Sequence, residues 1–280
     1  MAILLDGKAL AAKVKAQVRE EAAGLARKPG LAVVLVGDDP ASRVYVSGKE
    51  RDCAECGLLS QEFHLPADTG EPELLELIRR LNADAGVDGI LVQLPLPGKL
   101  DERMVIHAIT PDKDVDCFHP FNVGQLVLGD PAFLPCTPAG VMELLRAYDI
   151  PIRGRHCVVL GRSNIVGKPM ASLLLQSDGT VTTCHSRTEK LAEITRQADI
   201  LISAVGRRKL VTADMVREGA AVVDVAMNRD ENGKLCGDVD FGPVSEKASY
   251  ITPVPGGVGP MTRAILMRNI LTAARRHQDR

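Results

Sequence analysis

Two side chains able to take part in proton transfer stand four residues apart near the start of the chain. Tyr45 and Lys49 fall in a stretch expected to be helical, where residues at this spacing share one face and lie one turn apart. They are therefore close enough to act on one chemical group. The alternative is a surface pair in which the lysine stem packs on the tyrosine ring.

A glutamine and a charged loop follow later segments of the same half. Gln93 ends an apolar stretch of strand character and precedes the prolines of residues 94–97. Ligands of open α/β sheets gather outside such strand ends, but a glutamine there can equally serve to tie down the loop that follows. The segment from Lys113 to Asp116 has, by itself, the composition of a solvated charged turn.

A glycine turn in the second half has the context of a dinucleotide site. The apolar run 156–160 ends at Gly161 and passes through Arg162 and Ser163 to Gly167, where a helix is expected to begin. A helix start offers free N–H groups and a positive dipole end to a pyrophosphate, and glycines let the backbone approach it. Ser163 stands where the usual pattern has its second glycine, so a plain strand-to-helix turn is the alternative.

The end of the next strand bears on the choice between NAD and NADP. Enzymes that use NAD carry an acidic residue there for the ribose 2′-hydroxyl, whereas this chain has His185-Ser186-Arg187-Thr188. Hydroxyls and a guanidinium, with Arg162 and Ser163 in the glycine turn, suit a phosphate dianion and favour NADP. Arg162 and Arg187 could also be solvated surface arginines, and only their joint placement at two strand ends argues against this.

Strands and helices alternate along the chain, which predicts an α/β fold. Helices are expected at 8–27, 41–56, 72–82, 101–109, 139–148 and from about 260 onward, and strands at 31–36, 60–65, 89–94, 156–160, 180–185, 199–204 and 220–225. We therefore expect two α/β lobes with a cleft between them, the C-terminal lobe being a Rossmann-type dinucleotide-binding domain. The expected domains are residues 1–120, joined by a C-terminal helix at 261–280, and residues 138–260, with a loop at the boundary.

Composition excludes several classes of protein. Of 280 residues, 45% are hydrophobic and 25% charged, and a net charge of −2 with scattered basic residues is not that of a nucleic-acid binder. No stretch approaches the length of a membrane span, and we expect no membrane partner. Seven irregularly placed cysteines without a secretory signal indicate reduced thiols and a cytoplasmic protein. The pair Cys53 and Cys56 lacks a second pair or a nearby histidine, so no metal is expected.

Five segments, taken together and in order, resemble the methylenetetrahydrofolate dehydrogenase/cyclohydrolase family. They are Ala41 to Lys49, Asp88 to Pro97, Lys113 to Asp116, Gly161 to Gly167 and Pro253 to Thr262. The resemblance implies oxidation of 5,10-methylenetetrahydrofolate by NADP to the methenyl compound, which water converts to 10-formyltetrahydrofolate. It also implies tetrahydrofolate derivatives as the ligands and a homodimer formed by the cofactor lobe.

The resemblance assigns roles by motif position. It implies that Lys49 is the central catalytic residue, that Tyr45 packs beside the folate, that Gln93 supports Lys49 and that Asp116 holds the pterin. A carboxylate suits that last task because it can accept two hydrogen bonds from the amino-pyrimidinone edge. The predicted substrate residues are Tyr45, Lys49, Gln93, Leu94, Pro95, Asp116, Pro255, Gly256 and Gly257, and the predicted cofactor residues are Gly161, Arg162, Ser163, Val166, Gly167, Ser186 and Arg187.

Three positions depart from the family pattern. Cys117 stands where glycine usually follows the aspartate, Gly48 precedes the lysine, and Ala226 replaces a common glycine. A side chain at 117 could alter the pterin loop, because it cannot freely adopt backbone angles reserved for glycine. An enzyme of the same fold with the dehydrogenase activity alone or with NAD, and a non-catalytic dinucleotide-binding module, are the rival hypotheses.

Overall fold

The computed structural model describes residues 1–98 and 100–279, with Ala41 described by its backbone alone. The chain forms two compact units. Unit 1 contains Met1–Ala11 and Pro135–Thr262, and unit 2 contains Ala12–Leu134 and the chain from Arg263 onward. The helices α1 (Gly7–Ala22) and α10 (Val258–Gln278) therefore contribute residues to both units.

Unit 2 is built on a parallel sheet of three strands in the order β3-β2-β4. The strands are β2 (Gly30–Val36), β3 (Leu59–Leu65) and β4 (Gly89–Val92). All residues of β2 and β4 are buried, as expected for continuous apolar runs in a parallel sheet, while the edge strand β3 is partly exposed. This sheet matches the alternation predicted from the sequence.

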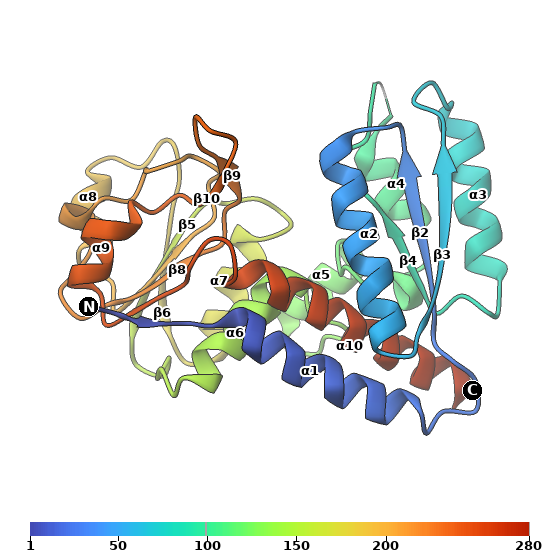
Figure 1. Cartoon of the computed structure of the whole chain (residues 1–280), viewed down its shortest axis with the longest axis horizontal. Helices are drawn as coiled ribbons and strands as arrows, with labels where there is room; N and C mark the ends of the chain where they lie inside the picture. The colour runs from blue at the N-terminus through green and yellow to red at the C-terminus, as the bar shows by residue number, and fades with distance from the viewer. Residues whose placement is uncertain (99, 280) are drawn as a thin grey trace. The chain divides into compact units, whose positions relative to one another are not determined.

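Helices cover both faces of this sheet (Figure 1). On one face, α3 (Glu71–Ala83) and α4 (Glu102–Ala108) share a buried apolar cluster with β2 and β4. The side chains that α3 buries, Leu74, Leu77, Ile78 and Leu81, follow the spacing of one helical face. On the opposite face lies α2 (Pro40–Glu55), which packs against β2 and β3.

The expected boundary loop contains two helical segments that the sequence did not predict. A short 3-10 helix, η1, spans Pro111–Lys113, and α5 spans Pro120–Leu128. Three apolar side chains of α5 face solvent, namely Phe121, Val127 and Leu128. Because these exposed residues break the amphipathic pattern, periodicity did not reveal the helix.

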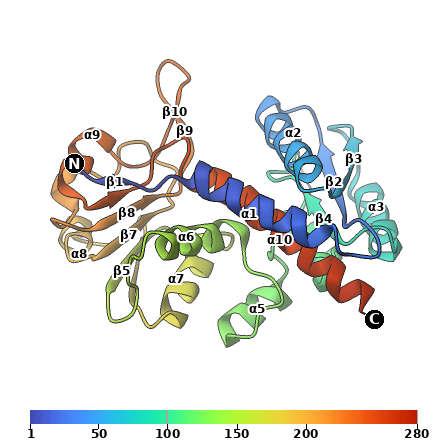
Figure 2. The same cartoon turned by 60° about the horizontal axis from the view of Figure 1, so that its bottom comes forward.

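Unit 1 contains a parallel sheet of six strands in the order β1-β11-β8-β7-β5-β6. Its strands are β1 (Ile3–Leu4), β5 (His156–Leu160), β6 (Thr180–Cys184), β7 (Ile200–Ser203), β8 (Ala221–Asp224) and β11 (Tyr250–Ile251). Figure 2 shows α6 (Cys136–Ala147) and α7 (Gly167–Gln176) next to this sheet. The α/β fold class predicted from the sequence is confirmed.

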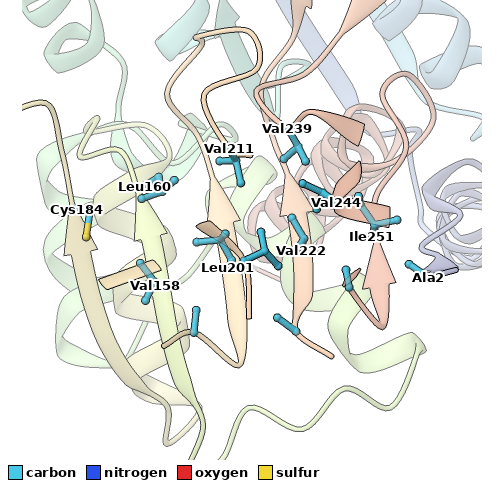
Figure 3. Packing of buried hydrophobic residues seen from close by; sticks show 14 residues of the cluster. Ala2, Val158, Leu160, Cys184, Leu201, Val211, Val222, Val239, Val244 and Ile251 are labelled. Atoms are coloured by element: carbon cyan, nitrogen blue, oxygen red, sulfur yellow. The ribbon is translucent and has the colours of Figure 1, made fainter. Parts of the chain in front are cut away.

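One buried apolar cluster of unit 1 lies against one face of the sheet. Figure 3 shows Val158 and Leu160 of β5 directed to the same side as Leu201, Val222 and Ile251. Residues two apart in a strand face the same side, which is why alternate positions form this cluster. The remaining elements of the unit are short: α8 (Leu191–Thr195), η2 (Ala213–Met215), β9 (Asn228–Arg229), β10 (Leu235–Cys236) and α9 (Phe241–Lys247).

The beginning of the chain differs from the expected domain division. Strand β1 pairs with β11, and the backbone N of Ile3 donates to Ser249 O at 2.8 Å. The first residues therefore complete the sheet of unit 1, whereas the sequence predicted them in the first domain with the rest of 1–120. A two-residue strand with a partner so distant in sequence leaves no local pattern. No helix of the described chain is long and apolar enough to cross a membrane.

Candidate active site

Lys49 and Gln93 are joined by a hydrogen bond. Helix α2 begins after Asp39, whose carboxylate accepts from the backbone N of Ser42 at 2.8 Å, and it carries Lys49 partly buried. Lys49 Nζ donates to Gln93 Oε1 at 3.0 Å. The structure thus brings together two residues that lie 44 positions apart in sequence.

The rest of Gln93 is fixed by the backbone. Its N–H donates to Val34 O at 2.9 Å and its Nε2 donates to Leu94 O at 2.7 Å. Gln93 therefore ties down the loop after β4, which is one of the two roles considered from the sequence, and at the same time presents its amide oxygen to Lys49. A ligand contact by Gln93 stays a prediction. Because the side-chain amide nitrogen is already engaged, the amide orientation that presents oxygen to the lysine is the satisfied one.

Tyr45 lies one turn before Lys49 on α2, and its side chain is 40% exposed. The peptide bond between Leu94 and Pro95 is cis, which shapes the loop directly after Gln93. Tyr45 and Pro95 thus stand close in sequence to Lys49 and Gln93, the two partners of the hydrogen bond.

The charged segment that ends in Asp116 divides into structural and candidate functional residues. Lys113 is buried and its Nζ donates to Leu81 O at 3.0 Å and Asp84 O at 2.7 Å, at the C-terminal end of α3. Asp114 is also buried and accepts from the backbone N of His119 at 2.8 Å. Burial lowers the pKa of Lys113 and raises that of Asp114. Neither residue belongs to a solvated turn.

Asp116 is half-buried and follows directly on this anchored segment. Asp114 forms a parallel bridge with Ile90 of β4, so the chain runs beside β4 toward the end of the sheet where Gln93 lies. Val115 between them is buried, and its carbonyl accepts from Asn269 Nδ2 at 2.8 Å. The backbone around Asp116 is therefore held on both sides.

Cys117 has a φ of 62°, in the left-handed region that favours glycine. Its thiol is buried and donates to Phe133 O at 3.4 Å. A side chain in this region costs on the order of 1 kcal/mol, which the buried contact offsets. The sequence argument that position 117 requires backbone angles typical of glycine thus agrees with the structure, and the loop accommodates cysteine.

The other two departures from the family pattern have local surroundings that fit them. A Cβ on Gly48 would come within 2.4 Å of Arg263 Nη1, so glycine lets this arginine approach α2. There Arg263 Nε pairs with Asp52 Oδ2 at 3.0 Å. Ala226 is buried, and its backbone N donates to Asp224 Oδ1 at 3.1 Å.

The glycine turn of unit 1 requires its two glycines. Gly161 has a φ of 114°, and a Cβ there would lie 2.3 Å from Ala204 O. A Cβ on Gly167 would lie 2.3 Å from Gly161 O. Ser163, at the place of the usual second glycine, accepts through Oγ from the backbone N of Val166 and of Gly167, both at 3.2 Å, and so stabilises the start of α7.

Register brings the predicted phosphate contacts together. In the pairing of β5 with β6, Leu160 lies opposite Cys184, and Gly161 N donates to Cys184 O at 2.9 Å. Two residues further along each strand stand Arg162 and Ser186, and Arg187 follows; all three are exposed. The glycine turn and the turn after β6 therefore lie at the same edge of the sheet.

The residues of the predicted substrate loop in unit 1 make backbone contacts. Gly256 O accepts from Lys8 N at 3.0 Å, and a Cβ on Gly7 would lie 1.7 Å from Gly257 O. The peptide bond between Val254 and Pro255 is cis. These contacts support the start of α1 and lead into α10, which is the helix-start role considered from the sequence.

The CxxC cysteines are core residues. Burial raises the pKa of Cys53 to about 12 and that of Cys56 to about 11. Cys53 Sγ lies 3.6 Å from Met267 Sδ, and Cys56 Sγ lies 3.7 Å from Lys15 O. Burial in the apolar core therefore disfavours the thiolate form of both cysteines.

Sequence comparison covers both units. The family model described as "Tetrahydrofolate dehydrogenase/cyclohydrolase, catalytic domain" matches residues 5–116, and that described as "Tetrahydrofolate dehydrogenase/cyclohydrolase, NAD(P)-binding domain" matches residues 135–278. The chain belongs to this family. It is a tetrahydrofolate dehydrogenase/cyclohydrolase whose C-terminal half is an NAD(P)-binding domain, and the family, fold class and enzyme class predicted from the sequence are confirmed.

Relatives match over nearly their full length. The "Bifunctional protein FolD" of Acetivibrio thermocellus is 56% identical over 275 residues, covering 97% of this chain and 96% of the relative. The solved structure of bifunctional FolD from Campylobacter jejuni is 52% identical, covers 99% of both chains and has a TM-score of 0.97. FolD from Trypanosoma brucei, solved in complex with NADP and an inhibitor, is 41% identical, covers 98% of both chains and has a TM-score of 0.94.

Proposed function

We propose that this protein oxidises 5,10-methylenetetrahydrofolate with NADP and hydrolyses the methenyl product to 10-formyltetrahydrofolate, with Lys49 as the central acid and base. The observation that carries this proposal is the hydrogen bond of 3.0 Å from Lys49 Nζ to Gln93 Oε1. It fixes a titratable amine at the carboxyl end of a parallel strand, where ligands of α/β sheets bind.

Hydrolysis of the methenyl compound needs proton movement. Water attacks the carbon between the two nitrogens, and one carbon–nitrogen bond breaks as the formyl C=O forms. Of the two protons that the water oxygen loses, one passes to the departing nitrogen and the other is released to solvent. The Lys49 amine can accept a proton from the attacking oxygen and deliver it to the departing nitrogen. Gln93 Oε1 orients the amine by accepting a hydrogen bond from it. Asp116 would hold the pterin by accepting hydrogen bonds from its amino-pyrimidinone edge, and Tyr45 would pack beside the ring.

The glycine turn fits a dinucleotide. A Cβ at Gly161 or Gly167 would collide with backbone, so the glycines keep the turn narrow, and the start of α7 offers the positive end of the helix dipole to a pyrophosphate. When bound, the nicotinamide accepts the hydride. This transfer relies mainly on alignment of the two reactants.

NADP is preferred over NAD in this proposal because of the edge formed by β5 and β6. Arg162 and the Ser186–Arg187 turn lie at adjacent strand ends, and no carboxylate is found among residues 185–188. Arginine offers forked, charge-assisted hydrogen bonds to a phosphate. The complex of the Trypanosoma brucei relative with NADP supports the same choice.

The decisive experiment replaces Lys49 with Gln. This change keeps much of the stem and a polar tip but removes the titratable amine, so methenyl hydrolysis should fall by about 10²- to 10⁴-fold. Dehydrogenase activity, which relies more on alignment, should fall less. Both rates, NADP affinity and thermal unfolding are measured on one preparation.

The matched control is Lys13→Gln, which removes an exposed lysine of α1 in the same unit and should leave both rates unchanged. If Lys49→Gln hydrolyses the methenyl compound at the parental rate, the base lies elsewhere and the proposed mechanism is wrong. Loss of both activities together with a lowered unfolding temperature would instead show that Lys49 supports the fold.

Assembly and compartment complete the proposal. We propose a homodimer formed by unit 1, whose sheet ends at β1 with Ile3 and Leu4 each about half exposed, an apolar edge suited to pairing. Seven free cysteines, six of them buried, support a reducing compartment such as the cytoplasm. Light scattering of the purified protein tests the dimer.

A further inference from the structure

A buried carboxylate in unit 1 organises the turn that follows β7. Asp238 has no exposed surface and lies just after β10. Its two oxygens accept five hydrogen bonds: Oδ2 from Ser203 Oγ at 2.9 Å, Val205 N at 2.9 Å and Gly206 N at 3.2 Å, and Oδ1 from Arg207 N at 2.6 Å and Asn228 Nδ2 at 3.0 Å.

All five donors are neutral groups, three of them backbone N–H groups of consecutive residues. Hydrogen bonds to a carboxylate are stronger than those between neutral groups, and here they fix both the turn at 203–207 and Asn228, the first residue of β9. An amide at position 238 could not replace the carboxylate, because its NH₂ group would face donors. The shape of the turn therefore depends on the carboxylate itself.

This turn adjoins the glycine turn. In the pairing of β5 with β7, Leu160 lies opposite Ser203, and Ala204 N donates to Leu160 O at 2.8 Å. The oxygen of Ala204 is the atom that a Cβ on Gly161 would meet at 2.3 Å. Because the two turns are in such close contact, a shift of the turn at 203–207 displaces Gly161 or opens a gap beside it.

A second buried carboxylate holds Asp238 in place. Asp224, at the end of β8, accepts from the backbone N of Asp238 at 3.1 Å and of Val239 at 2.8 Å. A Cβ on Gly237 would lie 2.0 Å from Asp224 Oδ2, so glycine is needed for this approach. The backbone N of Asp224 in turn donates to Thr252 Oγ1 at 2.7 Å.

We infer that Asp238 is a positioning residue for the dinucleotide: its carboxylate holds the turn at 203–207 against Gly161 and so shapes the cofactor edge of the sheet. The inference rests on the proposed function, which places the cofactor at the glycine turn. Asp238 acts through the turn and needs no contact with the cofactor.

The test is Asp238→Asn in the full-length protein, with NADP affinity measured by calorimetry and kcat and KM measured for NADP and for the folate. We expect the Kd and KM for NADP to rise by at least about 10-fold, since several hydrogen bonds of one carboxylate are lost together. The KM for the folate and the methenyl hydrolysis rate should stay within about twofold of the parent. In the described chain, Asp238 contacts no residue assigned to the folate, and substitutions away from a site usually have effects of about this size.

The matched control is Asp199→Asn. Asp199 also accepts a backbone N–H, that of His156 at 2.9 Å, but it precedes β7 and so lies at the opposite end of that strand. Ser203→Ala is a milder companion that removes one donor and leaves the carboxylate; it should raise the NADP Kd by about two- to fivefold even if Asp238→Asn does not fold.

Three outcomes would overturn the inference. One is an unchanged NADP Kd in both Asp238→Asn and Ser203→Ala, and another is an equal loss of NADP affinity in Asp199→Asn. A lowered unfolding temperature with parental NADP binding would make Asp238 purely structural. A parent protein that binds no NADP would overturn the proposed function and this inference with it, whereas NADP binding by the parent keeps the two separable.

Discussion

Single side chains at both candidate sites stabilise the fold and are also proposed to take part in function. Gln93 fastens its own loop through Leu94 O and offers its oxygen to Lys49, and Ser163 stabilises the start of α7 at a position expected to be glycine. The sequence suggested each residue from its place after a strand. It could not show the second role, because that role depends on backbone atoms brought near by folding.

In the proposed function, the choice between NADP and NAD depends on Arg162. We expect Arg162→Ala to weaken NADP binding by about 10- to 100-fold, because a charge-assisted contact to the 2′-phosphate is worth about 1.5–3 kcal/mol, and to leave NAD binding nearly unchanged. Titration of both nucleotides against the parent and the variant measures this difference.

Arg153→Ala provides the control for Arg162→Ala. Arg153 is an exposed arginine that precedes β5 and pairs with Asp178 at 3.4 Å, so its loss removes the same charge from the other end of that strand. Equal losses of NAD and NADP affinity in Arg162→Ala would assign Arg162 to general electrostatic attraction. Equal losses of NADP affinity in Arg162→Ala and Arg153→Ala would lead to the same conclusion.

At the scale of elements, continuous apolar runs predicted the central strands well. Strand β5 has the predicted bounds 156–160, and β2 differs by one residue, because a fully buried parallel strand must be apolar throughout. Helix α5 and strand β1 were missed. The first exposes apolar side chains on its outer surface, and the second is two residues long with a partner near residue 250.

The segment Lys113–Asp116 shows the limit of sequence patterns within one motif. Its four residues looked alike as a charged turn, but Lys113 stabilises the end of α3 and Asp114 supports the start of α5. Nothing in the local sequence separates these buried charges from Asp116. Likewise, Asp224 ends an apolar strand and Asp238 stands in a sequence typical of a turn, and only the assembled sheet shows that both are buried.

Two substitutions within the segment Lys113–Asp116 should affect different properties, one of them ligand binding and the other stability. Asp116→Ala should weaken folate binding by about 10-fold or more with little change in stability, since it removes hydrogen bonds to the ligand. Lys113→Met should lower the free energy of unfolding by about 1–3 kcal/mol, because the carbonyls of Leu81 and Asp84 lose their donor, and should leave NADP binding unchanged.

Folate titration, NADP titration and urea unfolding on both variants check this division. If Asp116→Ala binds folate as the parent does, Asp116 returns to the role of a solvated turn residue. If Lys113→Met is as stable as the parent, the carbonyls at the end of α3 find other partners and the proposed capping role is wrong.

At the scale of the whole molecule, the fold of unit 2 depends on contacts between the two ends of the chain. Asp88, at the start of β4, accepts from Arg27 Nη1 at 2.7 Å and Nη2 at 2.6 Å, and from Gly30 N at 2.9 Å. Its Oδ1 also lies 3.0 Å from His277 Nδ1 at the end of α10. One buried carboxylate thus joins residues 27–30 to His277, which lie about 250 positions apart in sequence.

The ionisation of Asp88 should make this junction sensitive to acid. Burial opposes ionisation of the carboxylate, but the hydrogen bonds from Arg27, Gly30 N and His277 outweigh it and hold the pKa below its usual value. A carboxyl group whose pKa is lower in the folded than in the unfolded state adds stability above the unfolded pKa of about 4. That stability is lost as the pH falls through the folded pKa.

Asp88→Asn tests this linkage. At pH 7 the variant should lose about 3 kcal/mol of unfolding free energy, because it leaves Arg27 without its buried partner. The difference between parent and variant should narrow as the pH falls from 5 to about 3, since only the parent takes up a proton at this site. Urea unfolding followed by circular dichroism at several pH values measures the unfolding free energies of parent and variant. Because both proteins contain His277, the comparison isolates the change at residue 88.

Glu76→Gln serves as the comparison for Asp88→Asn. Glu76 pairs with Arg79 at 2.7 Å on the exposed face of α3, where solvent screens the interaction, so its removal should change stability little at any pH. A difference between parent and Asp88→Asn that stays constant from pH 7 to pH 3 would show that shape, not charge, holds the two chain ends at this carboxylate. A difference that narrows in Asp88→Asn alone would place the acid sensitivity of unit 2 at the junction of Arg27, Asp88 and His277.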